Sequence, residues 1–318
     1  MIGPHCSISD IEPSDSQATM DHHGIPLFIN PTAGRGRAGR EAALMSEILN
    51  SHGIAHTPVA SRHPGDMEDL VFAAVTEGQR KLLIAGGDGS VHEAVNGILR
   101  TNEKVEFGVI PLGTGNDFAK ACSIPLHWTD AVTLLAQRMK SGAHSRQIDA
   151  GRFNDRFFAN GAGIGFDAKV SRISSSIKLP IGDFVYLLGV FRAMWDGIAT
   201  PELSLAFGDT RFDGKLTLAG ICNGPWVGGM FHLAPNAAND DGVLDLVYAE
   251  AVSRWRILGL IPKIIRGTHL AEPEVTRSPI TKCKIVASAP VPSHLDGEIQ
   301  EMQTEFNIEI LAGALHLL

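Results

Sequence analysis

The sequence KLLIAGGDGSVHEAVNG, residues 81–97, decides the fold class. Its apolar run KLLIA is typical of a buried strand, and three glycines in the next four positions form a loop around Asp88. Ser90 and Glu93 then make an S-x-x-E capping box, which predicts that a helix starts at Ser90. A strand, a glycine loop and a helix in this order indicate a parallel α/β layer.

The same unit occurs on both sides of this stretch. LFIN runs into PTAGRGRAGRE at 31–41, IAHTPVA at 54–60 precedes the helical run MEDLVFAAVTEG, and VEFGVIP at 105–111 runs into LGTGNDFAKAC. Short connections between alternating strands and helices favour strands that lie parallel in one sheet. We therefore expect an α/β domain with a parallel sheet over residues 24–146.

Residues that end or cap helices stand where these units change. We expect Gly53 to follow the end of the first helix, since glycine is common just past a helix terminus. Asp66 is placed to cap the second helix, and Asn116 and Asp117 are placed to cap the helix after the third loop.

The pattern changes after about residue 146. RQIDAGRFNDRFFANGAGIGF has short alternating runs joined by an Asn-Asp turn, and LSLAFGDTRFDGKLTLAGICNG places Asp213-Gly214 at a hairpin position. Further strand-like runs follow, with helical stretches at 182–199 and 253–271 between them. We expect a mostly antiparallel β domain over residues 147–302.

Size and composition set broad limits. The 318 residues suit two domains, and the net charge of −8 argues against nucleic acid as a partner. The cysteines are far apart and form no CxxC, which favours a reducing, cytoplasmic location over a disulfide scaffold or zinc site; they are Cys6, Cys122, Cys222 and Cys283. Residues 1–23 lack the apolar core of a signal peptide and are expected to form a disordered extension.

The first glycine loop matches G-x-G-x-x-G at Gly34, Gly36 and Gly39. A dinucleotide-binding fold also needs an acid about 20 residues on, at the end of the second strand, and residues 59–62 contain none. The NAD or FAD interpretation is therefore rejected. Two alternatives remain for this loop: an anion site at a helix N-terminus, or a plain tight turn.

The second and third loops carry more chemical information. The N–H groups of Gly89, Ser90 and Val91 are expected to point at a phosphate, and Asp88 beside them suits a divalent cation or a ribose hydroxyl. Thr114 offers a hydroxyl in the third loop. Because parallel strands end at one edge of a sheet, the three loops should converge on one ligand-binding crevice.

Four motifs occur in order along the chain: NPTAGRGRA, GGDGSVHEAVNG, PLGTGNDFA and, near the C-terminus, LDGE. Together they resemble the diacylglycerol kinase catalytic family, closest to the bacterial lipid kinases and alongside sphingosine and ceramide kinases. The resemblance implies an α/β ATP-binding domain like that of NAD kinases and phosphofructokinases, and then a β-sandwich substrate domain. It also implies an active site in the cleft between them and a last segment, 303–318, that returns to the first domain.

The resemblance also implies roles for particular residues. One of Asp296 and Glu298 would be the general base, and the sequence does not decide between them. Asp241, with the backbone of Ala238 and Val243, would hold a structural Mg²⁺. The residues implied at the ATP site are Asn30, Ser61, Gly86, Gly87, Asp88, Gly89, Ser90, Val91, His92, Gly113, Thr114, Asn116 and Asp117.

The chain departs from the family pattern at two positions in the second loop. The usual GGDGT is GGDGS here, which keeps the hydroxyl at Ser90. His92 stands where many bacterial members have Asn, which puts the nucleotide contacts at this position in doubt.

These features predict an ATP- and Mg²⁺-dependent lipid kinase. Diacylglycerol, phosphatidylglycerol, a sphingoid base and a soluble alcohol all remain open as acceptors. An NAD kinase-like enzyme and a non-catalytic nucleotide- or lipid-binding regulator are the alternatives, and the opening NPTAG and the final LDGE favour the lipid kinase.

The expected partners are the lipid, a homodimer partner and the inner face of a membrane. SRWRILGLIPKIIRG, residues 253–267, is basic and amphipathic, so it either lies on an anionic membrane or covers the β domain. The helical stretch from 182 either lines an acyl-chain cleft or covers the same domain.

Overall fold

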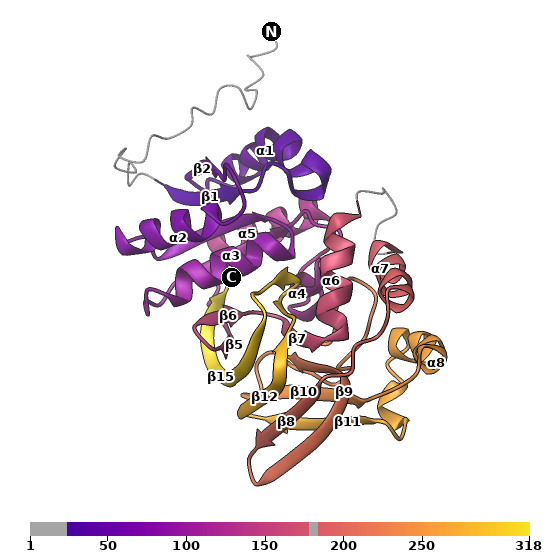
Figure 1. Cartoon of the computed structure of the whole chain (residues 1–318). Helices are drawn as coiled ribbons and strands as arrows, with labels where there is room; N and C mark the ends of the chain where they lie inside the picture. The colour runs from indigo at the N-terminus through magenta and orange to yellow at the C-terminus, as the bar shows by residue number, and fades with distance from the viewer. Residues whose placement is uncertain (1–23, 178–183) are drawn as a thin grey trace. The chain divides into compact units, whose positions relative to one another are not determined.

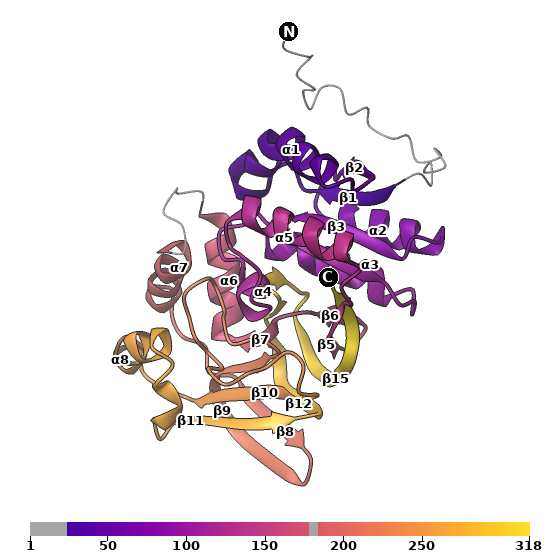
Figure 2. The same ribbon diagram turned by 180° about the vertical axis from the view of Figure 1, so that it is seen from behind.

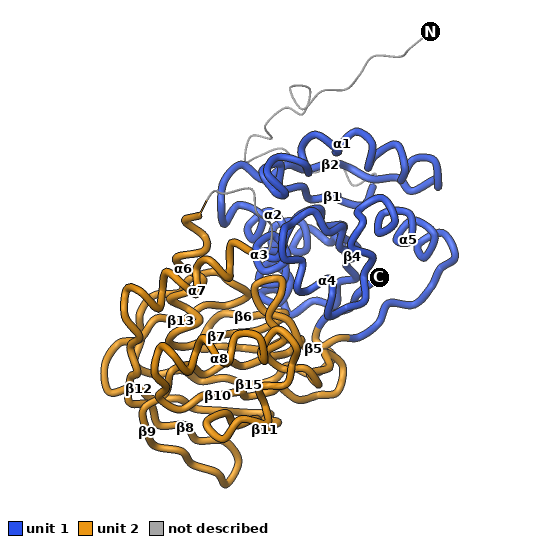
Figure 3. The backbone as a smooth tube through the Cα atoms, turned by 90° about the vertical axis from the view of Figure 1, so that its right-hand side faces the viewer, with its two compact units in different colours: residues 1–147, 315–318 blue, residues 148–314 orange. Residues whose placement is uncertain are grey.

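The computed structural model describes residues 24–177 and 184–318. The chain forms two compact units, 1–147 with 315–318 (unit 1) and 148–314 (unit 2), shown in blue and orange in Figure 3. The expected disordered extension over 1–23 lies outside the described residues.

Unit 1 contains a parallel sheet with strand order β2-β1-β3-β4. The final residues of β15 add a fifth parallel strand, since His316 pairs with Glu106 and Leu317 with Phe107 of β4. The interior strands have no polar face because both of their faces are covered, as expected for a parallel sheet. The strands are β1 (Ile25–Ile29), β2 (His56–Ala60), β3 (Lys81–Gly86), β4 (Glu106–Pro111) and β15 (Gln303–Leu317).

Helices alternate with these strands (Figure 1), which confirms the predicted α/β architecture. Met45 and Leu49 of α1 share one core with Trp128 and Val132 of α5 and with side chains of the sheet. Helices α2 and α3 pack against each other. The helices are α1 (Ala33–Ser51), α2 (Asp66–Thr76), α3 (Asp88–Leu99), α4 (Asp117–Ala121) and α5 (Trp128–Ser141).

The predicted ends of these helices are partly right. Gly53 follows α1 with φ of 77° and donates its N–H to Asn50 O, as expected of a C′ glycine. The prediction that Asp66 caps α2 is wrong by one residue, because Gly65 is the N-cap and the Asp66 carboxylate binds Arg62. This ion pair holds the pKa of Asp66 below its usual value.

The predicted capping box at Ser90 and Glu93 is also wrong. Helix α3 begins two residues earlier, at Asp88. The Glu93 carboxylate instead accepts hydrogen bonds from the N–H groups of Gly65 (2.9 Å) and Met67 (3.1 Å), so it caps α2 from a neighbouring helix. The sequence pattern identified a capping acid but assigned it to its own helix.

Removing this cap should destabilise unit 1. Glu93→Ala leaves two amides at the start of α2 without their acceptor, and we expect a loss of about 1–3 kcal/mol of unfolding free energy. Urea denaturation measures the loss, and hydrogen exchange should show faster exchange at Gly65 and Met67. Glu77→Ala, at the other end of α2, is the control and should change stability by less than about 0.5 kcal/mol. Equal effects of the two substitutions would contradict the assignment.

Unit 2 is a β-sandwich whose strand registers from β7 to β14 are antiparallel, as predicted. The first half of β9 pairs with β8, and its second half pairs with β7 and β10, so this one strand belongs to both layers. Strand β5 runs from unit 1 into unit 2. The strands are β5 (Arg146–Phe153), β6 (Arg156–Phe158), β7 (Gly161–Gly165), β8 (Glu202–Phe207), β9 (Thr210–Cys222), β10 (Leu244–Glu250), β11 (Val275–Ile280), β12 (Lys282–Val291), β13 (Ser293–Leu295) and β14 (Glu298–Ile299).

Three helices, α6 (Phe166–Ser176), α7 (Phe184–Trp195) and α8 (Arg254–Ile265), share a second apolar core in this unit, and a short 3₁₀ helix η2 (His269–Ala271) follows them. The sequence predicted α7 and α8 but missed α6. Among the described residues, no helix has both the length and the apolar character needed to cross a bilayer.

The predicted hairpin turn at Asp213-Gly214 is wrong. Both residues lie inside β9, and the turn is Gly208-Asp209, because Phe207 pairs with Thr210. Gly208 has φ of 54°, a conformation that glycine adopts at little cost. The Asp-Gly pair at 213–214 suggested the turn, but the Gly-Asp pair at 208–209 forms it.

Candidate active site

The three glycine loops of unit 1 contact one another through their backbones. In the first loop, Gly34, Arg35 and Gly36 have φ of 58°, 60° and 81°, which makes a left-handed turn before the regular part of α1. A Cβ added to Gly34 would lie 2.2 Å from the carbonyl oxygen of Leu112, next to the third loop. Glycine is therefore required here by packing of the chain on itself, which supports the tight-turn interpretation.

The second and third loops meet at a pair of glycines. A Cβ added to Gly87 would lie 2.9 Å from the Cα of Gly113, and one added to Gly113 would lie 2.6 Å from the Cα of Gly87. Any side chain at either position would separate the loops. The glycines thus bring the carboxyl ends of β3 and β4 together.

Polar side chains complete these loop contacts. Asn30 accepts from the N–H and hydroxyl of Thr32 and donates from Nδ2 to the Ser90 hydroxyl at 3.1 Å, which joins the first loop to the second. The carboxylate of Asp88 accepts from the N–H of Phe118 at 3.1 Å. Asp88 therefore caps α4, although the sequence assigned this role to Asn116 and Asp117.

The remaining positions implied at the ATP site differ in what they can offer. The N–H of Val91 donates to Gly87 O, so this amide is already used, contrary to the sequence-based expectation. Ser90, Val91 and His92 are each only 3% exposed, whereas the side chain of Thr114 is exposed. The amides of the first turn of α3, at Gly89 and Ser90, belong to the group that has no carbonyl one turn earlier to bind.

Two further implied positions lie at the edges of this region. Ser61 follows β2, and its N–H donates to Ile29 O, which places its backbone beside the start of the first loop. Asn116 has φ of 50° and donates from Nδ2 to Gly113 O at 3.1 Å. Its buried Oδ1 has no hydrogen-bond partner among the described residues.

In unit 2, the LDGE motif forms the hairpin that joins β13 to β14. Leu295 pairs with Glu298, and Asp296 and Gly297 between them have φ of 51° and 93°, as a type I′ turn requires. One oxygen of the Asp296 carboxylate accepts from the N–H groups of Asn160 (2.8 Å) and Gly161 (2.9 Å), and the other accepts from Ala159 (2.9 Å).

The two carboxylates of the motif are therefore in different environments. Three backbone donors hold Asp296 in place, and its own N–H donates to Gly161 O at 2.7 Å. Glu298 stands at the start of β14 with its side chain exposed. Asp296 fixes the turn, and Glu298 is the carboxylate that is exposed to solvent.

A buried polar pair, His294 and Asp167, lies next to this hairpin. The N–H of Gly297 donates to Nδ1 of His294 at 3.2 Å, so the proton of a neutral His294 ring is on Nε2, which lies 3.4 Å from Oδ2 of Asp167. Gly163 makes room for the pair, because a Cβ there would lie 1.9 Å from Asp167 Oδ2 and 2.4 Å from His294 Nε2.

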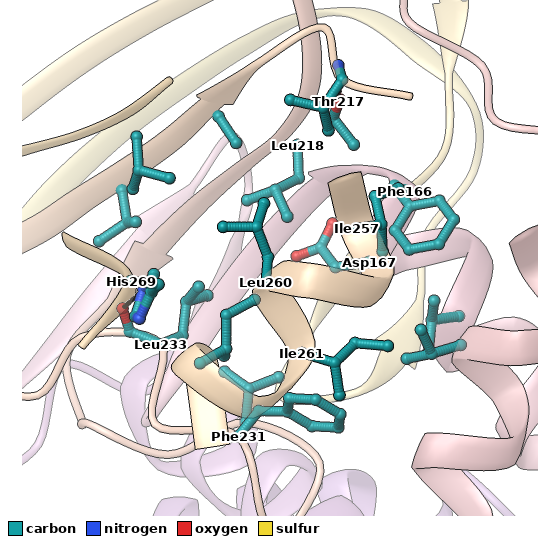
Figure 4. Close-up of a pocket in the computed structure, with 18 of the residues that line it drawn as sticks. Phe166, Asp167, Thr217, Leu218, Phe231, Leu233, Ile257, Leu260, Ile261 and His269 are labelled. Carbon is teal, nitrogen blue, oxygen red and sulfur yellow. Dashed lines mark hydrogen bonds between the residues drawn. The ribbon is translucent and has the colours of Figure 1, made fainter. Parts of the chain in front are cut away.

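Asp167 also lines an apolar pocket inside unit 2. Figure 4 shows the Asp167 carboxylate beside the aliphatic side chains of Leu218, Ile257 and Leu260, with His269 on the far side of that group. Burial lowers the pKa of His269, whose Nε2 contacts Leu233 O at 3.0 Å. The pocket therefore contains a neutral imidazole and is otherwise lined mainly by hydrocarbon.

The region implied for a structural cation is a loop before β10. Asp241 is exposed, and its Oδ1 accepts from the N–H of Val243 at 3.2 Å. The buried carboxylate of Asp149 holds this loop through the N–H of Gly242 at 2.8 Å and also binds the N–H of Gly313. No sequence pattern pointed to Asp149, because IDAG looks like an ordinary strand.

The cysteines in the described part of the chain lie in the interior of the two units. The three described cysteines, Cys122, Cys222 and Cys283, are free thiols and buried. Burial raises the pKa of Cys283 to about 12, so its thiol stays protonated.

Comparison with known proteins identifies the two units. The diacylglycerol kinase catalytic domain family matches residues 25–152, and the YegS C-terminal NAD kinase beta sandwich-like domain family matches residues 161–318. The chain belongs to the diacylglycerol kinase family. It is accordingly a kinase, a phosphotransferase, and it combines the catalytic domain with a YegS-like C-terminal domain.

Relatives of this kinase match along most of its length. The diacylglycerol kinase of Staphylococcus carnosus is 28% identical over 275 residues, which cover 86% of this chain and 87% of that protein. The diacylglycerol kinase of Bacillus subtilis is 27% identical over 273 residues, with 86% and 88% covered. A solved structure of a diacylglycerol kinase from Bacillus anthracis shares the fold, with a TM-score of 0.69 at 19% identity, and covers 94% of this chain and 97% of that one.

The contacts of Asp296 predict a structural cost for its replacement. Asp296→Asn keeps one oxygen for Asn160 and Gly161 but turns an NH₂ group toward the N–H of Ala159, so we expect a loss of about 1–3 kcal/mol of unfolding free energy. Urea denaturation measures the loss. The control is Asp155→Asn, an exposed acid in another turn of unit 2, which should change stability by less than about 0.5 kcal/mol. If the two variants unfold alike, the three hydrogen bonds do not hold the turn.

Proposed function

We propose that this kinase transfers the γ-phosphate of ATP, with Mg²⁺, to the hydroxyl of diacylglycerol or a closely related lipid alcohol. The observation that carries the proposal is the connection between the apolar pocket and the LDGE turn. Asp167 in the pocket wall contacts His294, and His294 binds the N–H of Gly297 in the turn before Glu298. One wall of the pocket is therefore linked to the turn that carries the exposed carboxylate.

The nucleotide is assigned to the loops of unit 1. Helix α3 begins directly behind the second loop, and the first amides and the dipole of a helix favour a phosphate. The exposed hydroxyl of Thr114 in the third loop can donate to the nucleotide. The positioning of these loops by glycine contacts, rather than any basic side chain, supports a site built mainly from backbone groups.

Glu298 is the general base in this proposal. Its carboxylate takes the proton of the acceptor hydroxyl while the hydroxyl oxygen attacks the γ-phosphorus, and the bond to the β-phosphate oxygen breaks to release ADP. Asp296 does not take this role because both of its oxygens already accept backbone N–H groups. It holds the turn that carries Glu298.

The donor types around Asp241 suit magnesium. A carboxylate and the backbone carbonyls of Ala238 and Val243 are hard oxygen ligands, and Mg²⁺ keeps several waters when protein ligands are few. The described residues contain no cluster of three or more His, Cys, Asp or Glu that could hold a metal ion. When bound, the ion would add positive charge to a loop that Asp149 already fixes through Gly242.

Replacing the base should separate catalysis from folding. We expect Glu298→Gln to lower kcat by about 10²–10⁴-fold, because a carboxamide cannot accept the hydroxyl proton. The KM for ATP and the melting temperature should not change, since the side chain is exposed. Steady-state assays with labelled ATP and diacylglycerol measure this. Glu301→Gln, an exposed acid three residues on, is the control. Wild-type turnover of Glu298→Gln would overturn the assignment.

Filling the pocket should change chain-length preference. Val190, a buried residue of α7, lines the pocket, and Val190→Phe should reduce kcat/KM for long-chain diacylglycerol at least tenfold while a short-chain diacylglycerol is still phosphorylated.

The same assay offers NAD beside diacylglycerol as acceptors. Phosphorylation of NAD and not of any lipid alcohol would favour the NAD kinase-like alternative, for which an apolar pocket has no use.

A further inference from the structure

Helix α7 has an exposed apolar stripe along its length. Phe184, Leu188, Phe191 and Trp195 follow one another at spacings of four, three and four residues, which places them on one side of a helix. Their exposed fractions are 60%, 39%, 45% and 85%. The other side of the helix, with Val190 and Met194, is buried. Single exposed apolar residues are common, but a continuous stripe marks a surface that binds something.

Helix α8 adds a second tryptophan to this stripe. Trp255 is 75% exposed, and it lines one shallow groove together with Trp195, Met194 and Arg254. Figure 2 shows α7 and α8 beside each other at the edge of unit 2. We call Phe184, Leu188, Phe191, Trp195 and Trp255 the aromatic face.

The charges around this face are positive. The described helices α6, α7 and α8 contain one acid, the buried Asp167, although the chain as a whole carries a net charge of −8. Their cations are Lys169, Arg172, Arg192, Arg254, Arg256 and Lys263.

Ion pairs reduce the number of these cations that can act at the surface. Arg256 and Lys263 bind Glu272, and Arg256 also binds Glu274, so half of the basic character predicted for residues 253–267 is neutralised. Arg192 pairs with Asp196 after the helix. Three exposed arginines form no ion pair with the described residues. They are Arg172, Arg254 and, just beyond α8, Arg266.

The inner sides of the same helices line the apolar pocket. Tyr186 and Val190 of α7 and Ile257 and Leu260 of α8 face it, while the aromatic face lies on the outer side. A lipid acceptor dissolved in a bilayer would then have to pass only these two helices to reach the pocket. This arrangement favours a membrane as the occupant of the face. A second copy of the chain would bring like-charged arginines together, which is unfavourable.

We propose that the aromatic face docks this kinase on an anionic phospholipid surface, with the aromatic rings at the headgroup level and Arg254 against the lipid phosphates. Aromatic side chains suit this boundary, and each nearby cation adds attraction to anionic lipid. The reason for docking rests on the lipid acceptor of the proposed function. The docking itself depends only on the aromatic face.

Vesicle flotation of the full chain tests the proposal. The wild type should float with vesicles of phosphatidylcholine mixed with phosphatidylglycerol and much less with phosphatidylcholine alone. Trp195→Glu should lower binding at least tenfold, and Arg254→Ala should lower it about fivefold on the anionic vesicles only. Leu134→Glu is the control, because Leu134 is an exposed apolar residue (41%) of α5 and lies outside the aromatic face. Failure of the wild type to float, or wild-type binding by Trp195→Glu, would overturn the proposal.

Two further measurements separate docking from catalysis and from dimer formation. Trp195→Glu should lose activity on diacylglycerol in anionic vesicles but keep it on a short-chain diacylglycerol free in solution. If the wild type phosphorylates neither acceptor, the proposed function fails, while the flotation result still decides docking. If gel filtration shows a dimer that Trp195→Glu splits, and flotation does not change, the face joins two copies and the membrane proposal is wrong.

Discussion

The carboxylate of Asp296 accepts hydrogen bonds from three consecutive backbone amides, and the LDGE turn of unit 2 depends on this interaction. It ties a short hairpin to the segment that leads into β7. The hairpin has two left-handed residues, so it needs such a restraint to keep one conformation. The two acids of the motif thereby differ, since Asp296 holds the backbone and Glu298 is exposed.

The loops of unit 1 are held in place by a different kind of contact. Its loops are held by close approach of backbone to backbone at Gly34 and at the Gly87–Gly113 contact, and the amide of Asn30 links two of them. These contacts are possible because glycine has no side chain, so one backbone can approach another closely. In the proposed nucleotide site, main-chain N–H groups are the ligand-binding surface, and only a substitution to proline would remove such a group.

The sequence predicted the arrangement of elements well because periodicity and glycine placement depend on local structure. It identified most of the strands in both units and the helices α7 and α8, but it missed β11 and α6. It failed where a side chain acts on a distant segment: Glu93 caps α2, Asp88 caps α4, and Asp149 holds the loop of Asp241. The local patterns around Glu93 and Asp88 suggest different roles, and Asp149 looks like an ordinary strand residue. The sequence left Asp296 and Glu298 equivalent for the same reason, since the amides that distinguish them are more than 130 residues away.

The strand order of unit 1 has a consequence for synthesis of the protein. Its fifth strand comes from the end of β15, and Leu315, Leu317 and Leu318 are buried there. The ribosome therefore makes all of unit 2 before it makes the residues that cover the free edge of β4. During that interval a nascent chain carries an apolar sheet with one open edge, the feature that most favours aggregation. Rapid folding of unit 2, which needs only its own continuous segment, would shorten the exposure.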